Sequence, residues 1–394
     1  MVTGMSRLWL PFTQMQSFDA SQRTFVRAER NHLIDARGRR VYDATSSIWT
    51  IVHGHGHPAI VEAISRQAAT LDHATTLGAS NPVAEALAAS LCRITGLDYA
   101  FFASDGASAV EAAVKMAVQY WRQRGEPQRT RFVRLADSYH GDTAAAMSLS
   151  DIAVFKAHFG AITFETRPLP DADLHAPDVA AVIVEPVVQA AAGIRVVPPV
   201  AYAPLRERST LLIVDEIATG FGRTGTMFAV EQLDVRPDLL CLGKGITGGA
   251  LALSATLATT RIYDAFLGEI DERKQFFHGH SYAGNPIACA AALASLALFE
   301  REGTLERARG IARTIAVRLA ALAAHPGVAQ VRSAGTMAGI DLRDAAVARD
   351  VAARLYDLGQ FTRAIGPTLQ LVPPLSSSDG ELHAFFDACE RVLA

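Results

Sequence analysis

Short apolar runs recur through the middle of the chain and are separated by longer segments with helical periodicity. The runs consist mainly of Val, Ile, Leu and Ala, and they lack the alternation of polar residues that marks a half-exposed strand. Strands of this kind are buried on both faces, which is typical of a parallel sheet covered by helices. We therefore predict an α/β fold with a mostly parallel sheet. The predicted strands are Arg131–Leu135, Ala180–Val184, Leu211–Val214, Leu239–Leu242 and Leu253–Ala258.

Helix boundaries are marked by Asn-Pro pairs and by glycines. One helix is predicted to begin at Asn81-Pro82 and to end before Gly96, and a second is predicted over Ser108–Arg124. A third runs from Asn285-Pro286 towards Gly303.

The pattern changes after about residue 300, where an Ala/Arg-rich helix precedes a strand at Gly335–Leu342 and a helix that ends at Gly359. A strand pair around Arg363 and Val372 and a closing helix after Ser378 complete a small α+β domain. We predict three parts: an N-terminal segment, residues 1–45, that packs with the small domain; a large domain, residues 46–300; and the small domain, residues 301–394.

Composition narrows the classes of partner. Only 20% of residues are charged and 50% are hydrophobic, which indicates that a second subunit covers part of the surface. A net charge of -3 gives no basic field for nucleic acid or anionic lipid, so small-molecule partners are expected. No apolar stretch is long enough for a membrane span, and the four cysteines lie far apart, which favours a reducing cytoplasm.

Asp215 and Lys244 each follow a predicted strand, at the edge of the sheet where α/β proteins bind ligands. A cofactor that acts as an electron sink needs an amine for a Schiff base and a carboxylate beside its ring nitrogen. This pair therefore predicts pyridoxal 5'-phosphate, with Lys244 as the amine and Asp215 as the carboxylate. Taken singly, Lys244 is more typical of a surface lysine and Asp215 of a strand-end cap, and it is the pair that indicates the cofactor.

Three further positions fit a planar phosphorylated cofactor. Ser104–Ser108 precedes a helix, whose free N–H groups and dipole favour a phosphate, although Asp105 repels a phosphate unless its side chain points away or caps the helix. Tyr139 is available to stack on a ring or is an ordinary turn residue. Glu185 either tunes the ring or caps Pro186.

Two other motifs carry less weight. His53-Gly-His55-Gly-His57 has alternating histidines, but its glycines leave it too flexible for a preorganised metal site, and we expect loop histidines and no metal. Gly243–Gly248 matches GxGxxG but lies deep in the chain without a surrounding dinucleotide-binding unit, so nicotinamide binding is not expected.

The segment Leu211–Gly225 (LLIVDEIATGFGRTG), with Pro237-Asp238 and Leu242–Gly245, resembles the cofactor signature of class III aminotransferases of fold type I. The resemblance covers nearly the whole chain and implies a large domain with a seven-stranded sheet. It also implies that the cofactor contacts Gly106, Ala107, Tyr139, Asp215, Ile217 and Lys244. By the same resemblance, Lys244, Asp215 and Tyr139 are the catalytic residues. The resemblance further implies a homodimer in which Ser281 reaches the phosphate in the other subunit.

Leu8–Met15, Ser46–Trp49, Tyr139–Asp142 and His278–Pro286 resemble the diaminopelargonate synthases within this class. Those enzymes aminate 8-amino-7-oxononanoate to 7,8-diaminononanoate in biotin biosynthesis, by a ping-pong reaction in which the cofactor lysine moves the proton. Phe12, Ile48 and Gln370 replace aromatic residues of the members that use S-adenosylmethionine, and this favours L-lysine as donor. The substrate positions that the resemblance implies are Phe12, Ile48, Trp49, Asp142, Arg223, Arg363 (for the substrate carboxylate) and Gln370.

Two alternatives stay open at this point. One is an ω-amino acid:pyruvate aminotransferase of broad range, or a class III enzyme of a specialised pathway. The other is a non-catalytic protein that binds the same cofactor; the sequence carries no added nucleic-acid-binding module that would favour it.

Overall fold

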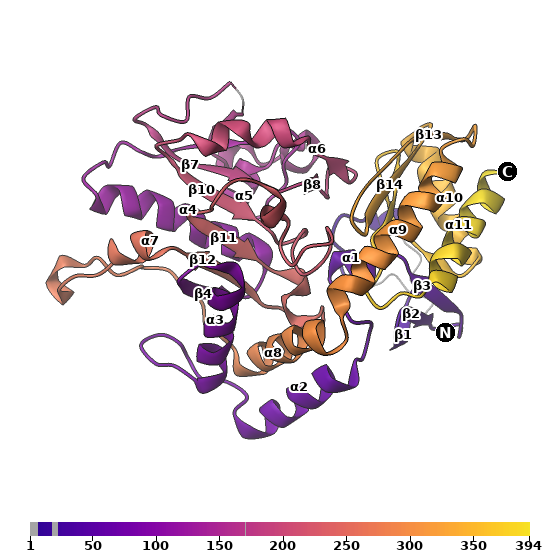
Figure 1. Cartoon of the computed structure of the whole chain (residues 1–394), viewed down its shortest axis with the longest axis horizontal. Coiled ribbons are helices and arrows are strands. Elements are labelled where there is room, and N and C mark those ends of the chain that lie inside the picture. The colour runs from indigo at the N-terminus through magenta and orange to yellow at the C-terminus, as the bar shows by residue number, and fades with distance from the viewer. Residues whose placement is uncertain (1–6, 18–22, 170) are drawn as a thin grey trace.

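A seven-stranded sheet forms the centre of the larger lobe in the computed structural model, which describes residues 7–17, 23–169 and 171–394 (Figure 1). The strand order is β4-β12-β11-β10-β7-β5-β6. β12 is antiparallel to both its neighbours, and the pairings among β11, β10, β7, β5 and β6 are parallel. The bounds are β4 (Tyr99–Ala103), β5 (Arg131–Arg134), β6 (Thr166–Pro168), β7 (Val179–Val184), β10 (Leu211–Asp215), β11 (Leu239–Leu242) and β12 (Ser254–Ala258).

The predicted mostly parallel sheet is thus confirmed, and each of the five predicted strands is present. The sequence analysis missed β4 and β6, which lie at the two edges of the sheet. An edge strand has one neighbour and stays partly exposed, so its residues do not form a continuous apolar run.

Helices cover both faces of this sheet, because successive strand residues point to opposite sides. Val182, Leu212 and Val214 pack in one core with α3 (Pro82–Thr95) and α8 (Pro286–Arg301). The alternate residues Ala181, Ile183, Leu211 and Ile213 pack in another core with α4 (Gly106–Gln123).

The predicted helix starts at Asn81 and Asn285 agree with the structure. Each asparagine accepts a hydrogen bond from the backbone N–H three residues later, at Ala84 (2.9 Å) and Ala288 (3.1 Å). Gly96 ends α3 in the left-handed conformation, with φ 71°.

The smaller lobe contains a four-stranded sheet of order β13-β14-β17-β16, with α9, α10 and α11 packed on it. The sequence analysis predicted its helices and β14 but missed β13. A second four-stranded sheet, β1-β2-β3-β15, joins residues 25–43 to residues 360–361. The bounds are β1 (Phe25–Glu29), β2 (His32–Asp35), β3 (Arg40–Asp43), α9 (Thr304–Leu322), β13 (Val328–Ala334), β14 (Met337–Leu342), α10 (Ala345–Asp357), β15 (Gln360–Phe361), β16 (Ala364–Ile365), β17 (Thr368–Leu371) and α11 (Asp379–Leu393).

The division into residues 1–45, 46–300 and 301–394 stays a prediction, and residues 1–6 and 18–22 of its first part lie outside the described residues. The remaining elements are short, apart from α2. They are η1 (Met15–Ser17), α1 (Ser46–Trp49), α2 (Pro58–Thr70), α5 (Ala144–Leu149), α6 (Ala153–Lys156), η2 (Gly160–Ile162), β8 (Val188–Gln189), β9 (Arg195–Val196), η3 (Pro199–Arg206), η4 (Ala229–Gln232), η5 (Lys244–Thr247), α7 (Thr260–Asp264) and η6 (Ile270–Glu272).

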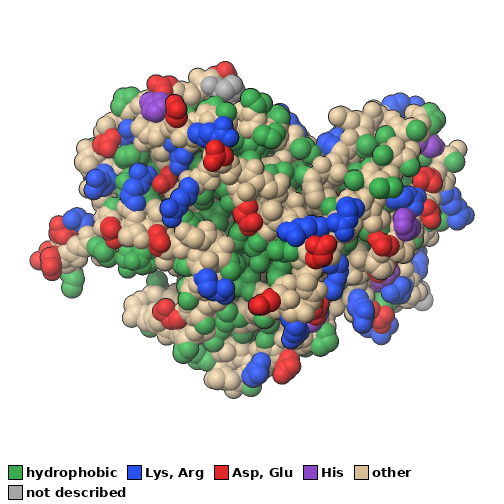
Figure 2. Space-filling view, in the orientation of Figure 1, with side chains coloured by type: hydrophobic (Ala, Val, Ile, Leu, Met, Phe, Trp, Pro, Cys, Tyr) green, Lys and Arg blue, Asp and Glu red, His purple; other side chains and the backbone are tan. Residues whose placement is uncertain are grey.

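Charged side chains of both signs are interspersed over the face shown in Figure 2, in keeping with the small net charge of -3. In the part of the chain that the structure describes, no helix is long and apolar enough to cross a membrane.

Candidate active site

A cavity of about 470 Å³ lies at the edge of the sheet where β10, β7, β5 and β11 end. Its size falls in the range of small-molecule sites. The loops after these strands supply most of its wall, and the start of α4 supplies the rest. The lining residues are Trp49, Asp105, Gly106, Ala107, Tyr139, His140, Gly141, Asp142, Thr143, Glu185, Ala190, Ala191, Asp215, Ile217, Ala218, Thr219 and Lys244.

Asp215 ends β10 and is buried at the floor of the cavity. Its Oδ2 lies 2.7 Å from Nδ1 of His140, and its Oδ1 accepts a hydrogen bond from the Ile217 N–H at 3.0 Å. These two contacts fix the plane of the carboxylate. Sequence reasoning missed His140, although its position directly after Tyr139 was a signal that could have found it.

Glu185 directly follows β7 beside this pair, and its Oε2 accepts a hydrogen bond from the Tyr139 N–H at 3.0 Å. Burial, and then the negative charge of Asp215, raise the pKa of Glu185 well above its ordinary value. The hydrogen bond from the Tyr139 N–H to Glu185 holds the loop that contains Tyr139 at the cavity.

Lys244 begins η5 directly after β11, and its backbone has a φ of 44°. Its Nζ lies 4.5 Å from the centre of the Trp49 ring, within the range of a cation–π contact. Burial lowers the pKa of Lys244 to about 8, although Asp215 and Glu185 act in the opposite direction. A lowered pKa leaves more of the amine uncharged near neutral pH, as a reacting amine requires.

We expect a distinct pH profile for the reactivity of this amine. In cofactor-free protein, acylation of Lys244 should rise with pH and reach half its maximum near pH 8, because the pKa there is about 8. Peptide mass spectrometry after brief labelling measures this rate. In the chain unfolded by urea, the midpoint of the acylation profile should return to about pH 10.5, the ordinary pKa of a lysine. Equal midpoints in folded and unfolded protein would contradict the prediction.

The same shift affects stability with a defined sign. Between pH 8 and 10.5 the unfolded chain holds the Lys244 proton and the folded chain does not. This group therefore makes the cofactor-free fold more stable as the pH rises through that window.

The N-terminus of α4 opens on the cavity at Gly106 and Ala107. The first N–H groups of a helix have no partner within it and attract anions. Asp105 caps the helix: its carboxylate accepts from the Ser108 N–H at 3.0 Å and the Ser108 hydroxyl at 2.8 Å. Capping was one of the two ways in which the predicted repulsion with a phosphate could be avoided.

Gly106 also keeps this part of the cavity open. A Cβ atom there would lie 2.9 Å from Cγ2 of Ile217, which is closer than side chains tolerate. The helix start, the buried amine and the carboxylate thus form donors and acceptors of the kinds that pyridoxal 5'-phosphate needs, and the residues present fit that cofactor.

Tyr139 is half-buried at the cavity, and its hydroxyl donates to Oδ2 of Asp142 at 2.9 Å. Burial and the adjacent Asp142 raise its pKa. Its ring meets Phe155 edge to face at 5.8 Å between centroids, and Phe155 meets Phe12 in the same way at 5.2 Å. Phe12 is 65% exposed and does not line the cavity.

The segment Ser46–Trp49 forms a left-handed helical turn without a glycine. Its φ values are 49° at Ser46, 48° at Ser47, 67° at Ile48 and 65° at Trp49. A left-handed helical conformation costs about 1–2 kcal/mol for each L-residue. Nothing in the sequence indicated this turn, which brings Trp49 to Lys244 and leaves Ile48 39% exposed.

Six predicted residues lie outside the lining of the cavity: the exposed Phe12 and Ile48, and Arg223, Gln370, Ser281 and Arg363. Arg223 is buried, and its guanidinium donates to the carbonyl oxygens of Pro373 (2.6 Å) and Ile51 (2.8 Å). Gln370 is buried and donates to the Ala190 carbonyl at 3.4 Å, just behind the cavity wall. Ser281 lies in an exposed segment. Arg363 precedes β16 and is half-buried.

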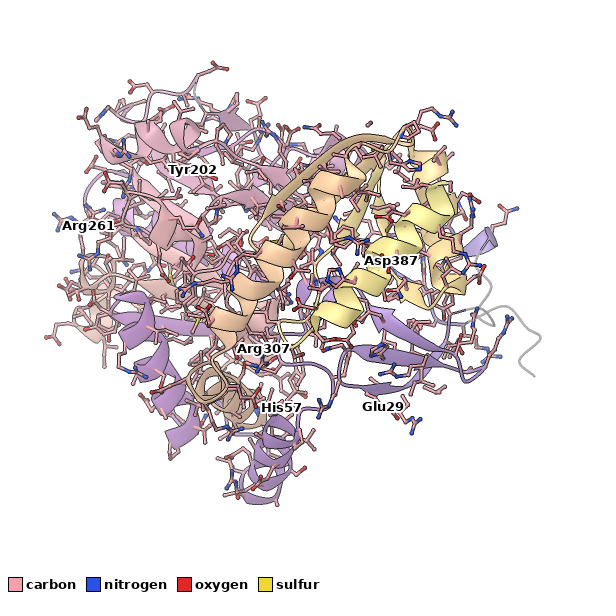
Figure 3. All side chains as sticks on the ribbon, turned by 45° about the vertical axis from the view of Figure 1, so that its right-hand side comes forward. Glu29, His57, Tyr202, Arg261, Arg307 and Asp387 are labelled. Atoms are coloured by element: carbon pink, nitrogen blue, oxygen red, sulfur yellow. The ribbon has the colours of Figure 1, made fainter. Side chains whose placement is uncertain are left out.

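The alternating histidines have separate partners. His53 Nε2 lies 3.2 Å from Ser295, His55 Nε2 lies 2.9 Å from Asp43, and His57 Nε2 lies 3.1 Å from Glu302. Figure 3 shows His57 near Arg307, which also contacts the Glu302 carboxylate. Among the described residues, no group of His, Cys, Asp and Glu is arranged to hold a metal ion.

Comparison with known proteins agrees with this geometry. The family model for aminotransferase class III matches residues 15–393. The chain belongs to the class III aminotransferase family. Its members depend on pyridoxal 5'-phosphate, and the chain is an aminotransferase of this class.

Three relatives illustrate the similarity. An adenosylmethionine-8-amino-7-oxononanoate aminotransferase from Aquifex aeolicus is 40% identical, over 96% of this chain and 93% of the relative. The crystal structure of an enzyme with the same name from Methanocaldococcus jannaschii has a TM-score of 0.91 at 38% identity, covering 98% of this chain and 97% of that one. An amine transaminase from an uncultivated Pseudomonas species, in its PLP-bound form, has a TM-score of 0.93 at 31% identity, covering 99% of each chain.

Proposed function

We propose that this aminotransferase converts 8-amino-7-oxononanoate to 7,8-diaminononanoate in biotin biosynthesis, with pyridoxal 5'-phosphate bound in the cavity. One observation carries the chemistry: the Lys244 amine, the Asp215 carboxylate and the start of α4 all open on one cavity. The proposed substrate is supported by the relatives from Aquifex and Methanocaldococcus, because 8-amino-7-oxononanoate is part of the names of both enzymes.

Each part of the cofactor has a candidate partner. The N–H groups at Gly106 and Ala107 would hold the phosphate, and Asp215 would hold the ring nitrogen. Tyr139 and Ile217 line the cavity where a ring needs apolar and aromatic neighbours. Lys244 would bond to the aldehyde.

The mechanism assigns few tasks to the protein. When bound, pyridoxal 5'-phosphate supplies an aldehyde that bonds amines and a ring that withdraws electrons. Lys244 would hold the cofactor through its aldehyde between turnovers, and once free its Nζ would take a proton from the substrate carbon and return it, as base and acid, in both half-reactions. The charge of Asp215, oriented by His140, would keep the ring nitrogen protonated. The two substrates act in successive half-reactions.

Arg363 is the candidate for the substrate carboxylate. Burial lowers the pKa of its guanidinium, and within the described residues no hydrogen bond or ion pair to that group occurs. A partly desolvated cation without a partner favours an anion. Gln370 links it to the cavity, because the Gln370 N–H donates to the Arg363 carbonyl at 3.0 Å and its side chain donates to Ala190.

Replacing Arg363 with alanine should raise KM for 8-amino-7-oxononanoate between about tenfold and 100-fold, the worth of a charged hydrogen-bonded pair. Steady-state kinetics with varied acceptor measures this. Arg343→Ala, at an exposed arginine of the same lobe, is the matched control and should leave KM unchanged. An unchanged KM in Arg363→Ala would place the carboxylate elsewhere.

We propose L-lysine as the amino donor. Phe12 and Ile48 are exposed, and Gln370 turns its amide to the Ala190 carbonyl, so these three positions do not form a closed aromatic box for a sulfonium group. Trp49 and Asp142 remain as wall residues for the substrates. Arg223, whose guanidinium is held by two carbonyl groups, would act from behind the wall.

A donor screen tests both substrate assignments. Loss of the cofactor's visible band on adding lysine, S-adenosylmethionine or alanine identifies the donor in a single half-reaction. A second candidate function is a broad amine transaminase, which the TM-score of 0.93 to the Pseudomonas enzyme favours. No turnover of 8-amino-7-oxononanoate with any donor, together with turnover of simple amines, would favour that candidate.

We infer that the enzyme is a cytoplasmic homodimer with the active site at the interface. Phe277 and Tyr282, both 63% exposed, flank Ser281 and leave an apolar surface uncovered in the single chain. Ser281 of the partner subunit would then reach the phosphate. Sedimentation equilibrium of the holoenzyme should give twice the mass of 42.1 kDa, and a monomer would contradict the inference.

A further inference from the structure

The left-handed turn at Ser46–Trp49 needs a physical explanation, because its four residues favour other backbone conformations. Ile48 is β-branched, which makes positive φ least favourable there. Such strain persists only where surrounding contacts impose it, and it is common at functional sites. The contacts that impose it are therefore part of how the site is built.

One buried carboxylate makes two of these contacts. Asp43 ends β3 with none of its surface exposed. Its Oδ1 accepts the Ser47 N–H at 3.0 Å, and its Oδ2 accepts the Ser47 hydroxyl at 2.7 Å. His55 Nε2 lies 2.9 Å from the same Oδ2 and fixes the carboxylate from the other side.

The other end of the turn is held by the backbone of the small lobe. The Ser46 hydroxyl donates to the Val372 carbonyl at 2.7 Å, and the Thr50 hydroxyl donates back to the carbonyls of Ser46 and Ser47, each at 3.1 Å. Trp49 then packs with Ala190 and Ala191, and its ring faces the Lys244 amine at 4.5 Å. Among these hydrogen bonds to the turn, only the two from Ser47 to Asp43 involve a carboxylate.

We propose that Asp43 is a positioning residue that holds the left-handed turn and thereby places the Trp49 ring against the amine of Lys244. His55 assists by orienting the Asp43 carboxylate. The proposal rests on the proposed function only in taking Lys244 as the reacting amine. It assigns a role to the middle histidine of the His-Gly-His-Gly-His motif.

The chain contains only four lysines, Lys115, Lys156, Lys244 and Lys274, which makes the test direct. Reductive methylation of the cofactor-free protein with carbon-13 formaldehyde gives a small set of NMR signals, and Lys244→Arg assigns one of them. In the parent, the methyl signal of Lys244 should lie upfield, because the Trp49 ring current acts on it. Trp49→Leu should abolish this upfield displacement.

Asp43→Asn should move the Lys244 signal toward those of the other three lysines. Asp35→Asn is the matched control, because Asp35 also ends a strand of the same sheet, is buried and holds Arg39. It should leave the signal in place. An Asp43→Asn signal that stays upfield would overturn the proposal. If Asp43→Asn does not fold, Ser47→Ala removes only the 2.7 Å hydrogen bond and should give a smaller shift of the same sign.

The holoenzyme provides a second readout. Asp43→Asn should lower kcat on the order of 100-fold, as expected for misplacement of a reacting group, with a smaller change in KM. Asp35→Asn should leave kcat within about twofold of the parent. If the parent catalyses no transamination but the NMR signal moves as expected, the proposed function fails and the positioning role of Asp43 stands.

Discussion

Replacing Lys244 with alanine is expected to lower kcat by about 10⁴-fold, the largest loss of any single substitution in this chain. The variant loses both the amine that bonds to the cofactor and the base that moves the proton. No other lysine can substitute, because the other three, Lys115, Lys156 and Lys274, lie outside the lining of the cavity. Single-turnover absorbance with the amino donor measures the loss.

A second measurement locates the attachment without turnover. Borohydride reduction of the parent, followed by peptide mass spectrometry, should place the cofactor's mass on the peptide that contains Lys244. Lys274→Ala, at a half-buried lysine that is paired with Glu272 and lies outside the cavity lining, is the matched control and should keep full activity. Cofactor mass on any other lysine, or a Lys244→Ala variant as fast as the parent, would refute the proposed chemistry.

Asp215→Asn is expected to lower kcat on the order of 10³-fold. Asparagine has nearly the same shape and can still bond to His140, but it carries no charge to keep the ring nitrogen protonated. The loss should therefore appear in kcat for both half-reactions, with little change in the free energy of unfolding. Rapid-mixing kinetics of each half-reaction and chemical denaturation measure the two quantities.

The control for Asp215 is an aspartate at the amino ends of the strands, opposite the carboxyl ends at which Asp215 lies. Asp238 precedes β11, accepts the Leu212 N–H at 2.9 Å and pairs with Arg208 and Arg261. Asp238→Asn should therefore reduce stability and leave kcat unchanged. Equal losses of kcat in the two variants would show that Asp215 acts through the fold and not through its charge.

Much of the fold could be predicted because buried elements require recognisable residue patterns, such as continuous apolar runs and capping side chains. β7 and β10 are covered on both faces, so their residues had to be apolar without alternation. Asn81 and Asn285 marked helix starts because a side chain must satisfy the free N–H groups there. The edge strands β4 and β6 were missed because they are partly exposed and therefore do not need a continuous apolar run.

The site could be predicted only in part. Asp215 ends β10 and Lys244 lies just after β11. These two strands are parallel neighbours, so their carboxyl ends lie on the same side of the sheet and bring the two residues to one cavity. The pairing of His140 with Asp215 depends on the path of the loop after β5, which local sequence does not specify. Similarly, whether Asp105 would repel a phosphate or cap α4 was decided only by its bonds to Ser108.

The sequence by itself determined the parallel core of the sheet, the helix starts and the strand ends at which Asp215 and Lys244 lie, because each depends on local pattern or on strand order. Only the tertiary structure decided the geometry around them. The Ser46–Trp49 turn shows why: its residues oppose a left-handed conformation, and contacts from Asp43 and from Val372, 326 positions after Ser46, impose it. A conformation that distant groups stabilise against local preference leaves no local signal to read.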